Sequence, residues 1–236
     1  LAERITSTVS LFADSQSIEI YACNVNCHIL RNYENFAESR NCKQYFPNNI
    51  PFAKGNSRFV DCGAYTGDTL TELVNNVGLV DTYIGFEPDR DTFSKLAKTA
   101  SGLRQKLGQA FLYPCAVGRV NESLTISGTV GMFALSETGG QSIQVVRLDD
   151  ALAAFAPTML KMDIEGAEID TIHGASELIR AHHPDLAICV YHKISDYWEI
   201  PVMLHELNPN YEFYLRSHSS CTLETVLYAT ERSRSI

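Results

Sequence analysis

The chain has 236 residues, of which 45% are hydrophobic and 20% charged, a profile typical of a globular protein with one large α/β domain. Its formal net charge of −9 argues against a nucleic-acid partner, because binding phosphates needs clustered Lys and Arg. There is no apolar run of about 18 residues, so no membrane-spanning helix is predicted.

The cysteines indicate a location. Their number is odd, seven, and three of them fall in predicted strands: Cys62, Cys115 and Cys189. This pattern favours reduced, buried thiols and therefore a cytoplasmic protein. Residue 1 is Leu rather than Met, so the absence of a signal-peptide pattern adds little evidence for a cytoplasmic location.

The first 50 residues are predicted to form a helical N-terminal segment, and residues 51–236 the main domain. Asp14 is a candidate N-cap, and apolar residues recur after it at about helical spacing. The stretch from Tyr45 to Arg58 contains two prolines, one glycine and three asparagines, so it is predicted to be a linker.

The rest of the chain alternates between strands and helices. Strands are predicted at 58–62, 82–88, 110–118, 158–166, 185–192, 211–218 and 224–229, and helices near 67–77, 89–107, 165–181 and 196–207. This alternation predicts an α/β fold with a mostly parallel sheet and helices on both faces. The last two strands lie close in sequence, which favours an antiparallel edge pair. Residues 121–127 and 142–150 are predicted to form a smaller antiparallel excursion around the glycine-rich segment 127–140.

A glycine turn, "DCGAYTGD", follows the first strand of the main domain. Gly63 and Gly67 allow a tight turn and the close approach of a ligand. A dinucleotide loop requires G-x-G-x-x-G, with its middle glycine against the pyrophosphate. Here the residues between the two glycines are Ala64, Tyr65 and Thr66. The loop therefore suits a nucleoside without phosphates, such as S-adenosylmethionine.

The acids near this turn support a nucleoside ligand. Glu87 ends the second strand, 24 residues after Gly63. An acid there accepts hydrogen bonds from ribose hydroxyls, whether in NAD or in S-adenosylmethionine. Asp61 and Asp68 have the right sign for the cationic groups of S-adenosylmethionine. Their alternative interpretation is that of surface acids at strand ends.

Three stretches together, "FVDCGAYTGDT", "GFEPD" and "LKMDIEGAE", resemble the FkbM family of S-adenosylmethionine-dependent methyltransferases. "CAVG", "RLDD" and the terminal "YLRSHS" and "ETVLYA" extend the similarity over about residues 58–230. The resemblance implies a Rossmann-like sheet and methyl transfer, usually to an oxygen and often to a sugar hydroxyl of a glycan or natural product.

The resemblance also implies a cofactor site. Asp61, Gly63 and Gly67 match the first motif, Glu87 matches the ribose acid, and Ala116 stands where adenine is expected to pack. The full expected set is Asp61, Gly63, Ala64, Tyr65, Thr66, Gly67, Thr69, Glu87, Pro88, Ala116 and Asp163. "CAVG" lacks the acid or amide with which many methyltransferases bind the adenine amino group.

Catalysis is predicted at the end of the strand "TMLKMDIEG". Lys161 and Asp163 lie on one face of it, although central parallel strands are usually apolar on both faces. Methyl transfer to a hydroxyl needs a base, and Asp163, Glu165 and His192 are the candidates. His192 ends the following strand and titrates near neutrality. Lys161 would hold a sugar oxygen or pair with Asp163.

Other interpretations stay open at this point. Glu165 also suits the positive end of a helix, and His192 also suits an ordinary strand end. Asp163, Glu165 and His192 would also serve as ligands of a divalent metal, which is the less favoured hypothesis. A dinucleotide-dependent oxidoreductase is disfavoured by the missing middle glycine and by the absence of a Tyr-x-x-x-Lys pair. A non-catalytic accessory module with the same fold is a further alternative.

Overall fold

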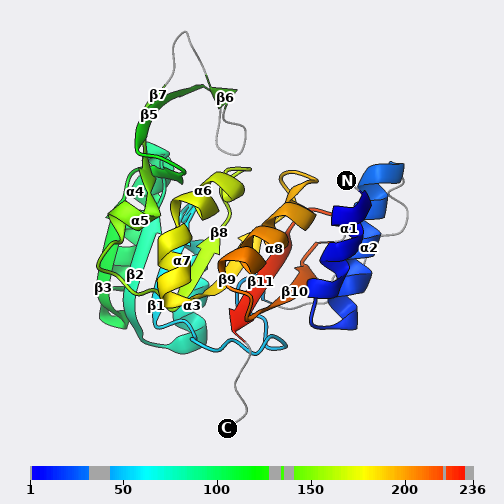
Figure 1. Cartoon of the computed structure of the whole chain (residues 1–236). Helices are drawn as coiled ribbons and strands as arrows, with labels where there is room; N and C mark the ends of the chain where they lie inside the picture. Colours follow the sequence, from blue (N-terminus) through cyan, green and yellow to red (C-terminus); the bar gives the residue numbers. More distant parts are fainter. Residues whose placement is uncertain (1, 32–42, 128–133, 136–140, 220–221, 232–236) are drawn as a thin grey trace. The chain divides into compact units, whose positions relative to one another are not determined.

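The protein is described here by a computed structural model, shown in Figure 1, that covers residues 2–31, 43–127, 134–135, 141–219 and 222–231. The chain divides into two compact units. The central unit comprises residues 56–182, and the terminal unit comprises residues 1–55 and 183–236.

The central unit contains four parallel strands in the order β8-β1-β2-β3. They are β1 (Arg58–Cys62), β2 (Val80–Phe86), β3 (Leu107–Tyr113) and β8 (Met159–Met162). Their connections contain α3 (Asp68–Val77), α4 (Arg90–Gly102) and the 3-10 helix η2 (Arg104–Lys106). Since β2 and β8 flank β1 on opposite sides, the strand order reverses there, and ligands bind at such reversals in open α/β sheets.

Strand β1 shows why these residues form a buried parallel strand. Three of its five residues are apolar and 0% exposed: Phe59, Val60 and Cys62. Buried parallel strands are expected to be apolar on both faces, and Asp61 departs from this pattern. Helix α3 starts after Gly67 and ends before Gly78, both in the left-handed region, with φ of 85° and 78°.

The segment predicted as one strand at 110–118 forms two strands. Strand β3 ends at Tyr113, and β4 (Ala116–Gly118) belongs to a second sheet of order β4-β7-β5-β6. Pro114 lies at the break and has no backbone N–H for a ladder. The second sheet also includes β5 (Glu122–Ser127), β6 (Ala134–Leu135) and β7 (Gln141–Arg147). Strands β5 and β7 are antiparallel, as predicted, and rise from the unit in Figure 1.

The helix predicted at 165–181 forms two helices, α6 (Glu168–Gly174) and α7 (Ser176–His182). The short helix α5 (Leu148–Ala151) precedes β8. A Cβ at Gly174 would lie 2.0 Å from the carbonyl oxygen of Gly118, so α6 ends in direct backbone contact with the end of β4. The carboxylate of Asp149 accepts the N–H groups of Glu177 and Leu178, at 3.2 and 2.8 Å, and so replaces the intrahelical bonds that the break removes.

The terminal unit contains helices and antiparallel strands. The helical elements are α1 (Ala2–Thr8), η1 (Val9–Leu11), α2 (Ser15–Leu30) and α8 (Asp196–Leu207). The strands are β9 (Asp185–Cys189), β10 (Tyr211–Ser217) and β11 (Thr225–Glu231), and β11 pairs antiparallel with both others. The predicted helical N-terminal segment and antiparallel pair are therefore confirmed. Asp14 caps α2 by accepting the Ser17 N–H at 2.8 Å, and its carboxylate pairs with buried Arg216 at 2.6 Å.

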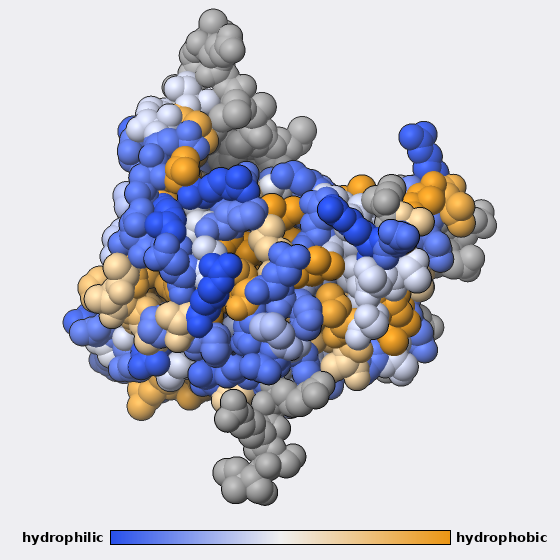
Figure 2. Space-filling model, in the orientation of Figure 1, coloured by the Kyte–Doolittle hydropathy of each residue, from blue (hydrophilic) through white to orange (hydrophobic). Residues whose placement is uncertain are grey.

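Among the described residues, the helices do not combine the length and apolar character that crossing a membrane requires. Figure 2 shows mostly hydrophilic residues on the face that it presents.

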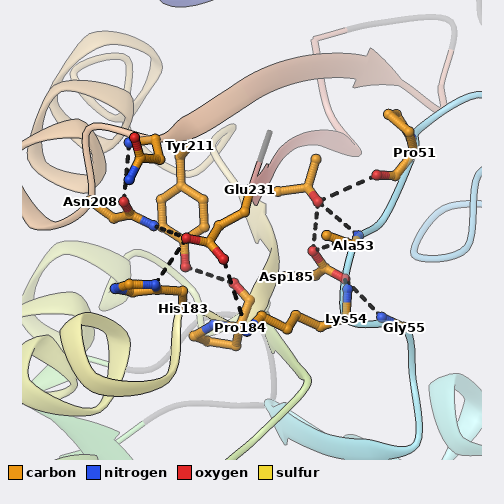
Figure 3. Close-up of polar contacts among 12 residues, drawn as sticks. Pro51, Ala53, Lys54, Gly55, His183, Pro184, Asp185, Asn208, Tyr211 and Glu231 are labelled. Carbon is orange, nitrogen blue, oxygen red and sulfur yellow. Dashed lines mark hydrogen bonds and ion pairs between the residues drawn. The ribbon is translucent and has the colours of Figure 1, made fainter. Parts of the chain in front are cut away.

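Asp185 fixes the predicted linker within the terminal unit (Figure 3). Its carboxylate is 0% exposed and accepts the N–H groups of Ala53, Lys54 and Gly55, at 3.2, 2.7 and 2.9 Å. The hydroxyl of Thr230 donates to the same carboxylate at 2.7 Å. One buried acid therefore satisfies three consecutive linker amides, which need partners once they are removed from water.

Replacing Asp185 with Asn is expected to destabilise the protein, because the amide NH₂ cannot accept the linker N–H groups. The loss should be about 2–4 kcal/mol in the free energy of unfolding, measured by chemical denaturation. Glu206→Gln, at an exposed position of α8, is the control and should have little effect. Equal stability of the two variants would contradict this role for Asp185.

Candidate active site

The glycine loop (residues 63–67) follows β1 and is bound to neighbouring elements by its own backbone. The N–H groups of Gly63 and Ala64 both donate to the carbonyl oxygen of Phe86, at 3.1 and 3.0 Å. The Gly67 N–H donates to the carbonyl oxygen of Ala64 at 2.9 Å. These amides are therefore engaged inside the protein and are not arranged as a phosphate cradle.

The loop is also fixed by steric constraints. A Cβ at Gly63 would lie 1.9 Å from the backbone oxygen of Asp163, and one at Gly67 would lie 2.9 Å from Thr99 Cβ. Both glycines have left-handed φ values, 80° and 85°, and Tyr65 between them has a φ of 46°. A non-glycine residue in this region is strained, and such residues cluster at functional sites. The glycine loop thus touches both the end of β8 and α4.

Glu87 lies directly against this loop, as the spacing predicts. It follows β2, is 6% exposed, and its carboxylate accepts the Tyr65 N–H at 3.0 Å and the Asp89 N–H at 2.9 Å. Burial raises the pKa of Glu87 to about 7, while the two backbone hydrogen bonds act to lower it. In its ionised form this carboxylate can accept hydrogen bonds from hydroxyl groups.

Asp61 and Lys161 form a buried ion pair beneath the loop. Lys161 Nζ lies 3.0 Å from Asp61 Oδ1, and the two residues are 2% and 0% exposed. The Tyr83 hydroxyl donates to Asp61 Oδ2 at 2.8 Å, and Lys161 Nζ donates to the carbonyl oxygen of Gly63 at 2.6 Å. Burial raises the pKa of Asp61, and Lys161 and the Tyr83 hydroxyl oppose that shift. Lys161 was expected to pair with Asp163 or to hold a sugar oxygen; the ion pair to Asp61 was not predicted.

The segment after β8 lies beside the glycine loop. Asp163 is half-buried, and its N–H donates to the carbonyl oxygen of Cys62 at 3.1 Å. Glu165 is exposed and has a left-handed φ of 56°. The carboxylate of buried Glu168 accepts the Ile164 N–H at 3.1 Å. The structure therefore places Asp163 and Glu165 in the turn that follows β8, and Glu168 holds that turn.

Of the remaining predicted residues, Thr69 and Pro88 border this arrangement in the chain, and Ala116 and His192 lie further along it. Thr69 is buried in the first turn of α3, Pro88 is half-buried after Glu87, and Ala116 begins β4. His192 belongs to the terminal unit, where it follows β9, and its ring centroid lies 4.2 Å from that of Tyr191. A role for His192 beside Asp163 therefore stays a prediction. In the described part of the chain, groups of three or more His, Cys, Asp or Glu side chains that would suit a metal ion were not found.

Sequence reasoning missed Tyr83. The available signal was a phenol hydroxyl in the part of β2 that follows Asp81, where every residue is buried. Tyr83 lies opposite Phe59 in the β1–β2 register and is 0% exposed. Burial and the adjacent Asp61 carboxylate raise the pKa of the Tyr83 hydroxyl well above its usual value, so this group remains a hydrogen-bond donor.

Parallel strands that reverse order beside β1, a glycine loop and an acid after β2 form the kind of edge at which open α/β sheets bind their ligands. Residues 61–218 match the family described as the methyltransferase FkbM domain. The chain belongs to the FkbM methyltransferase family, as the sequence motifs predicted, and this family implies methylation that depends on S-adenosylmethionine.

Solved structures agree with this assignment. The FkbM methyltransferase of Methylobacillus flagellatus is 25% identical with a TM-score of 0.81, and the match covers 97% of this chain and 58% of that protein. The Rossmann-like fold class is thereby confirmed. This chain thus spans little more than half the length of that protein. The comparison with curated proteins produced no match.

Other solved structures are similar at lower identity. A putative rRNA methylase from Clostridium thermocellum is 11% identical with a TM-score of 0.49, over 75% of this chain and 87% of that one. Fibrillarin from Aeropyrum pernix, solved with natively bound S-adenosylmethionine, is 12% identical with a TM-score of 0.48, over 77% and 70%. Both are too distant to inform the function of this chain.

Replacing Gly63 with Ala should disrupt the loop, since the new Cβ would meet the Asp163 backbone at 1.9 Å and would require a left-handed residue. The expected loss is at least about 2 kcal/mol in unfolding free energy. Gly102→Ala, at the end of α4 in open space, is the matched control. Thermal melts of both variants test this, and a Gly63→Ala protein as stable as the control would refute the contact.

Proposed function

We propose that this protein is an O-methyltransferase that transfers the methyl group of S-adenosylmethionine to a hydroxyl, that of a sugar in a glycan or natural product. The observation that carries the proposal is the Glu87 carboxylate lying against the glycine loop where the strand order reverses. The cofactor rests on the family together with this geometry. The hydroxyl and sugar acceptor rest on the family resemblance.

The residues at this edge of the sheet fit a nucleoside that has no phosphate. The amides of Gly63, Ala64 and Gly67 donate to protein carbonyls, and that of Tyr65 donates to Glu87. A pyrophosphate would need such amides for itself. Glu87 would accept the ribose hydroxyls, because each carboxylate oxygen can accept more than one hydrogen bond. These contacts support S-adenosylmethionine over a dinucleotide cofactor.

In this proposal the protein residues hold the acceptor and remove the proton from its hydroxyl. S-adenosylmethionine, when bound, supplies an electrophilic methyl group on a sulfonium. Asp163, in the turn after β8, takes the proton of the acceptor hydroxyl, and Glu165 is the second candidate in the same turn. General-base assistance of this kind accelerates a reaction by roughly 10²–10⁴-fold. His192 is a third candidate, from the terminal unit.

The direct test compares ligands and then acceptors. Calorimetry should detect binding of S-adenosylmethionine and S-adenosylhomocysteine and no binding of NAD. A panel of oligosaccharides and small hydroxylated compounds, incubated with the labelled methyl donor, should then identify an acceptor. Binding of NAD in place of S-adenosylmethionine would favour an oxidoreductase. Cofactor binding without transfer to any of these acceptors would favour a non-catalytic module.

The pKa of Glu87 predicts how cofactor affinity depends on pH. In the ligand-free protein burial raises this pKa to about 7, whereas ribose hydroxyls donate to the ionised form. Binding should therefore be tightest above pH 7 and weaken by about tenfold for each pH unit below the pKa. Calorimetry at several pH values measures this, and Glu87→Gln should bind more weakly and lose the dependence. Glu122→Gln, at an exposed position of β5, is the control, and a flat profile for the unmodified protein would contradict the ribose role.

Asp163→Ala is expected to separate binding from chemistry. S-adenosylmethionine affinity should stay within a few fold of wild type, while turnover falls by at least about 100-fold because the base is missing. Asp170→Ala, at an exposed position of α6, should keep full turnover. Unchanged turnover of the Asp163 variant would remove this residue from the mechanism and direct attention to Glu165 and His192.

A further inference from the structure

We propose that Lys161 is a positioning residue for the cofactor site. Its buried ammonium, held by Asp61, fixes the glycine loop through the carbonyl oxygen of Gly63 and thereby presents the loop to Glu87. This inference rests on the proposed function, since it concerns the same site. It replaces the expectation that Lys161 contacts the acceptor.

The burial of the pair argues against contact with an acceptor. Lys161 is 2% exposed and Asp61 is 0% exposed, so neither charge lies open to a bound ligand. The two residues are direct partners in the β1–β8 register, and their side chains meet at 3.0 Å. We therefore assign Asp61 to the pairing with Lys161, and its expected role toward the cationic groups of the cofactor stays a prediction.

Neighbouring residues are shaped around this pair. The Tyr83 hydroxyl reaches Asp61 Oδ2 at 2.8 Å, and Gly85, two residues further along β2, lies opposite Asp61 in the register. A Cβ at Gly85 would lie 3.0 Å from Tyr83 Cε1. The glycine therefore leaves room for the tyrosine ring to cross toward Asp61. The two oxygens of the Asp61 carboxylate therefore have different partners. Oδ2 accepts from Tyr83, and Oδ1 orients the ammonium of Lys161.

The lysine acts on the loop through one peptide group. Lys161 Nζ donates to the carbonyl oxygen of Gly63 at 2.6 Å, while the Ala64 N–H of the same peptide group donates to Phe86 at 3.0 Å. Both ends of that peptide group are thus fixed. The next amide, that of Tyr65, is the one that reaches Glu87 at 3.0 Å. Rotation of the Gly63–Ala64 peptide would displace the Tyr65 amide from Glu87, so the lysine acts on the ribose acid through the backbone.

A gain in stability alone does not explain why a buried ion pair occupies these two positions. Removing one partner of a buried ion pair is strongly destabilising, but replacing the whole pair by apolar residues of similar size is often neutral. A variant with an all-apolar replacement (Asp61→Leu, Tyr83→Phe and Lys161→Met together) can therefore fold while lacking the donor to Gly63. This variant separates a positioning role from a structural one.

The experiment compares this all-apolar variant, Tyr83→Phe alone, and Lys98→Met as the control at an exposed position of α4. Three measurements are made on each protein: the melting temperature, amide hydrogen exchange of residues 59–70 without ligand, and calorimetry with S-adenosylhomocysteine. Hydrogen exchange reads the loop directly and does not depend on turnover.

The all-apolar variant is expected to melt within about 5 °C of wild type, to exchange the glycine-loop amides about tenfold faster and to bind S-adenosylhomocysteine about tenfold more weakly. Tyr83→Phe keeps both charges and should weaken binding by about three- to tenfold, because only part of the loss of its hydrogen bond to Asp61 is transmitted to the loop through Lys161. Lys98→Met should match wild type in all three measurements.

Wild-type loop exchange and affinity in a folded all-apolar variant would overturn the inference. If that variant does not fold, an unchanged affinity of Tyr83→Phe overturns it. Failure of the proposed function looks different: wild-type protein would not bind S-adenosylhomocysteine at all, while faster loop exchange in the variants would still support the role of Lys161 in fixing the loop.

Discussion

At the carboxyl ends of β1 and β8 the backbone of Gly63 passes so close to Asp163 that a side chain at residue 63 would lie 1.9 Å from its carbonyl oxygen. The local geometry of the site follows from this contact. It requires glycine and a left-handed φ of 80° at residue 63. It also turns the next two amides toward Phe86 and Glu87, at 3.0 Å each. The position of the Glu87 carboxylate relative to the loop is therefore a consequence of how two strand ends meet.

The charges in the two strands follow the same geometry. Lys161 and Asp61 are partners in the parallel register, so each strand contributes one charge at the same level of the sheet. A charge in a buried parallel strand is costly unless its partner lies at hydrogen-bonding distance. The register supplies that partner, and the lysine then has a donor left for the Gly63 carbonyl. A polar pair that would weaken an ordinary core thereby becomes a support of the glycine loop.

Much of the fold was predictable because local patterns decide it. The strand at 58–62 and the helix at 196–207 have the predicted bounds, since apolar runs and turn residues delimit both. The helix predicted at 165–181 was wrong as a single element, because the contact between Gly174 and the Gly118 backbone is tertiary. The link between Glu87 and the loop was predictable from spacing. The partner of Lys161 was not, because Asp163 lies on the same face of the strand, and only the register identifies Asp61.

The fold by itself does not decide which nucleoside derivative binds, since open α/β sheets accept dinucleotides and S-adenosylmethionine at the same edge. The hydrogen bonds that the loop amides make do distinguish a dinucleotide from S-adenosylmethionine. A pyrophosphate is recognised by N–H groups that point out of the loop, and here the amides of Gly63, Ala64 and Gly67 donate to carbonyls inside the protein. These three amides are therefore already used within the protein. Under the proposed function Glu87 accepts the ribose hydroxyls, and the engaged amides together with this carboxylate favour an adenosine without phosphates.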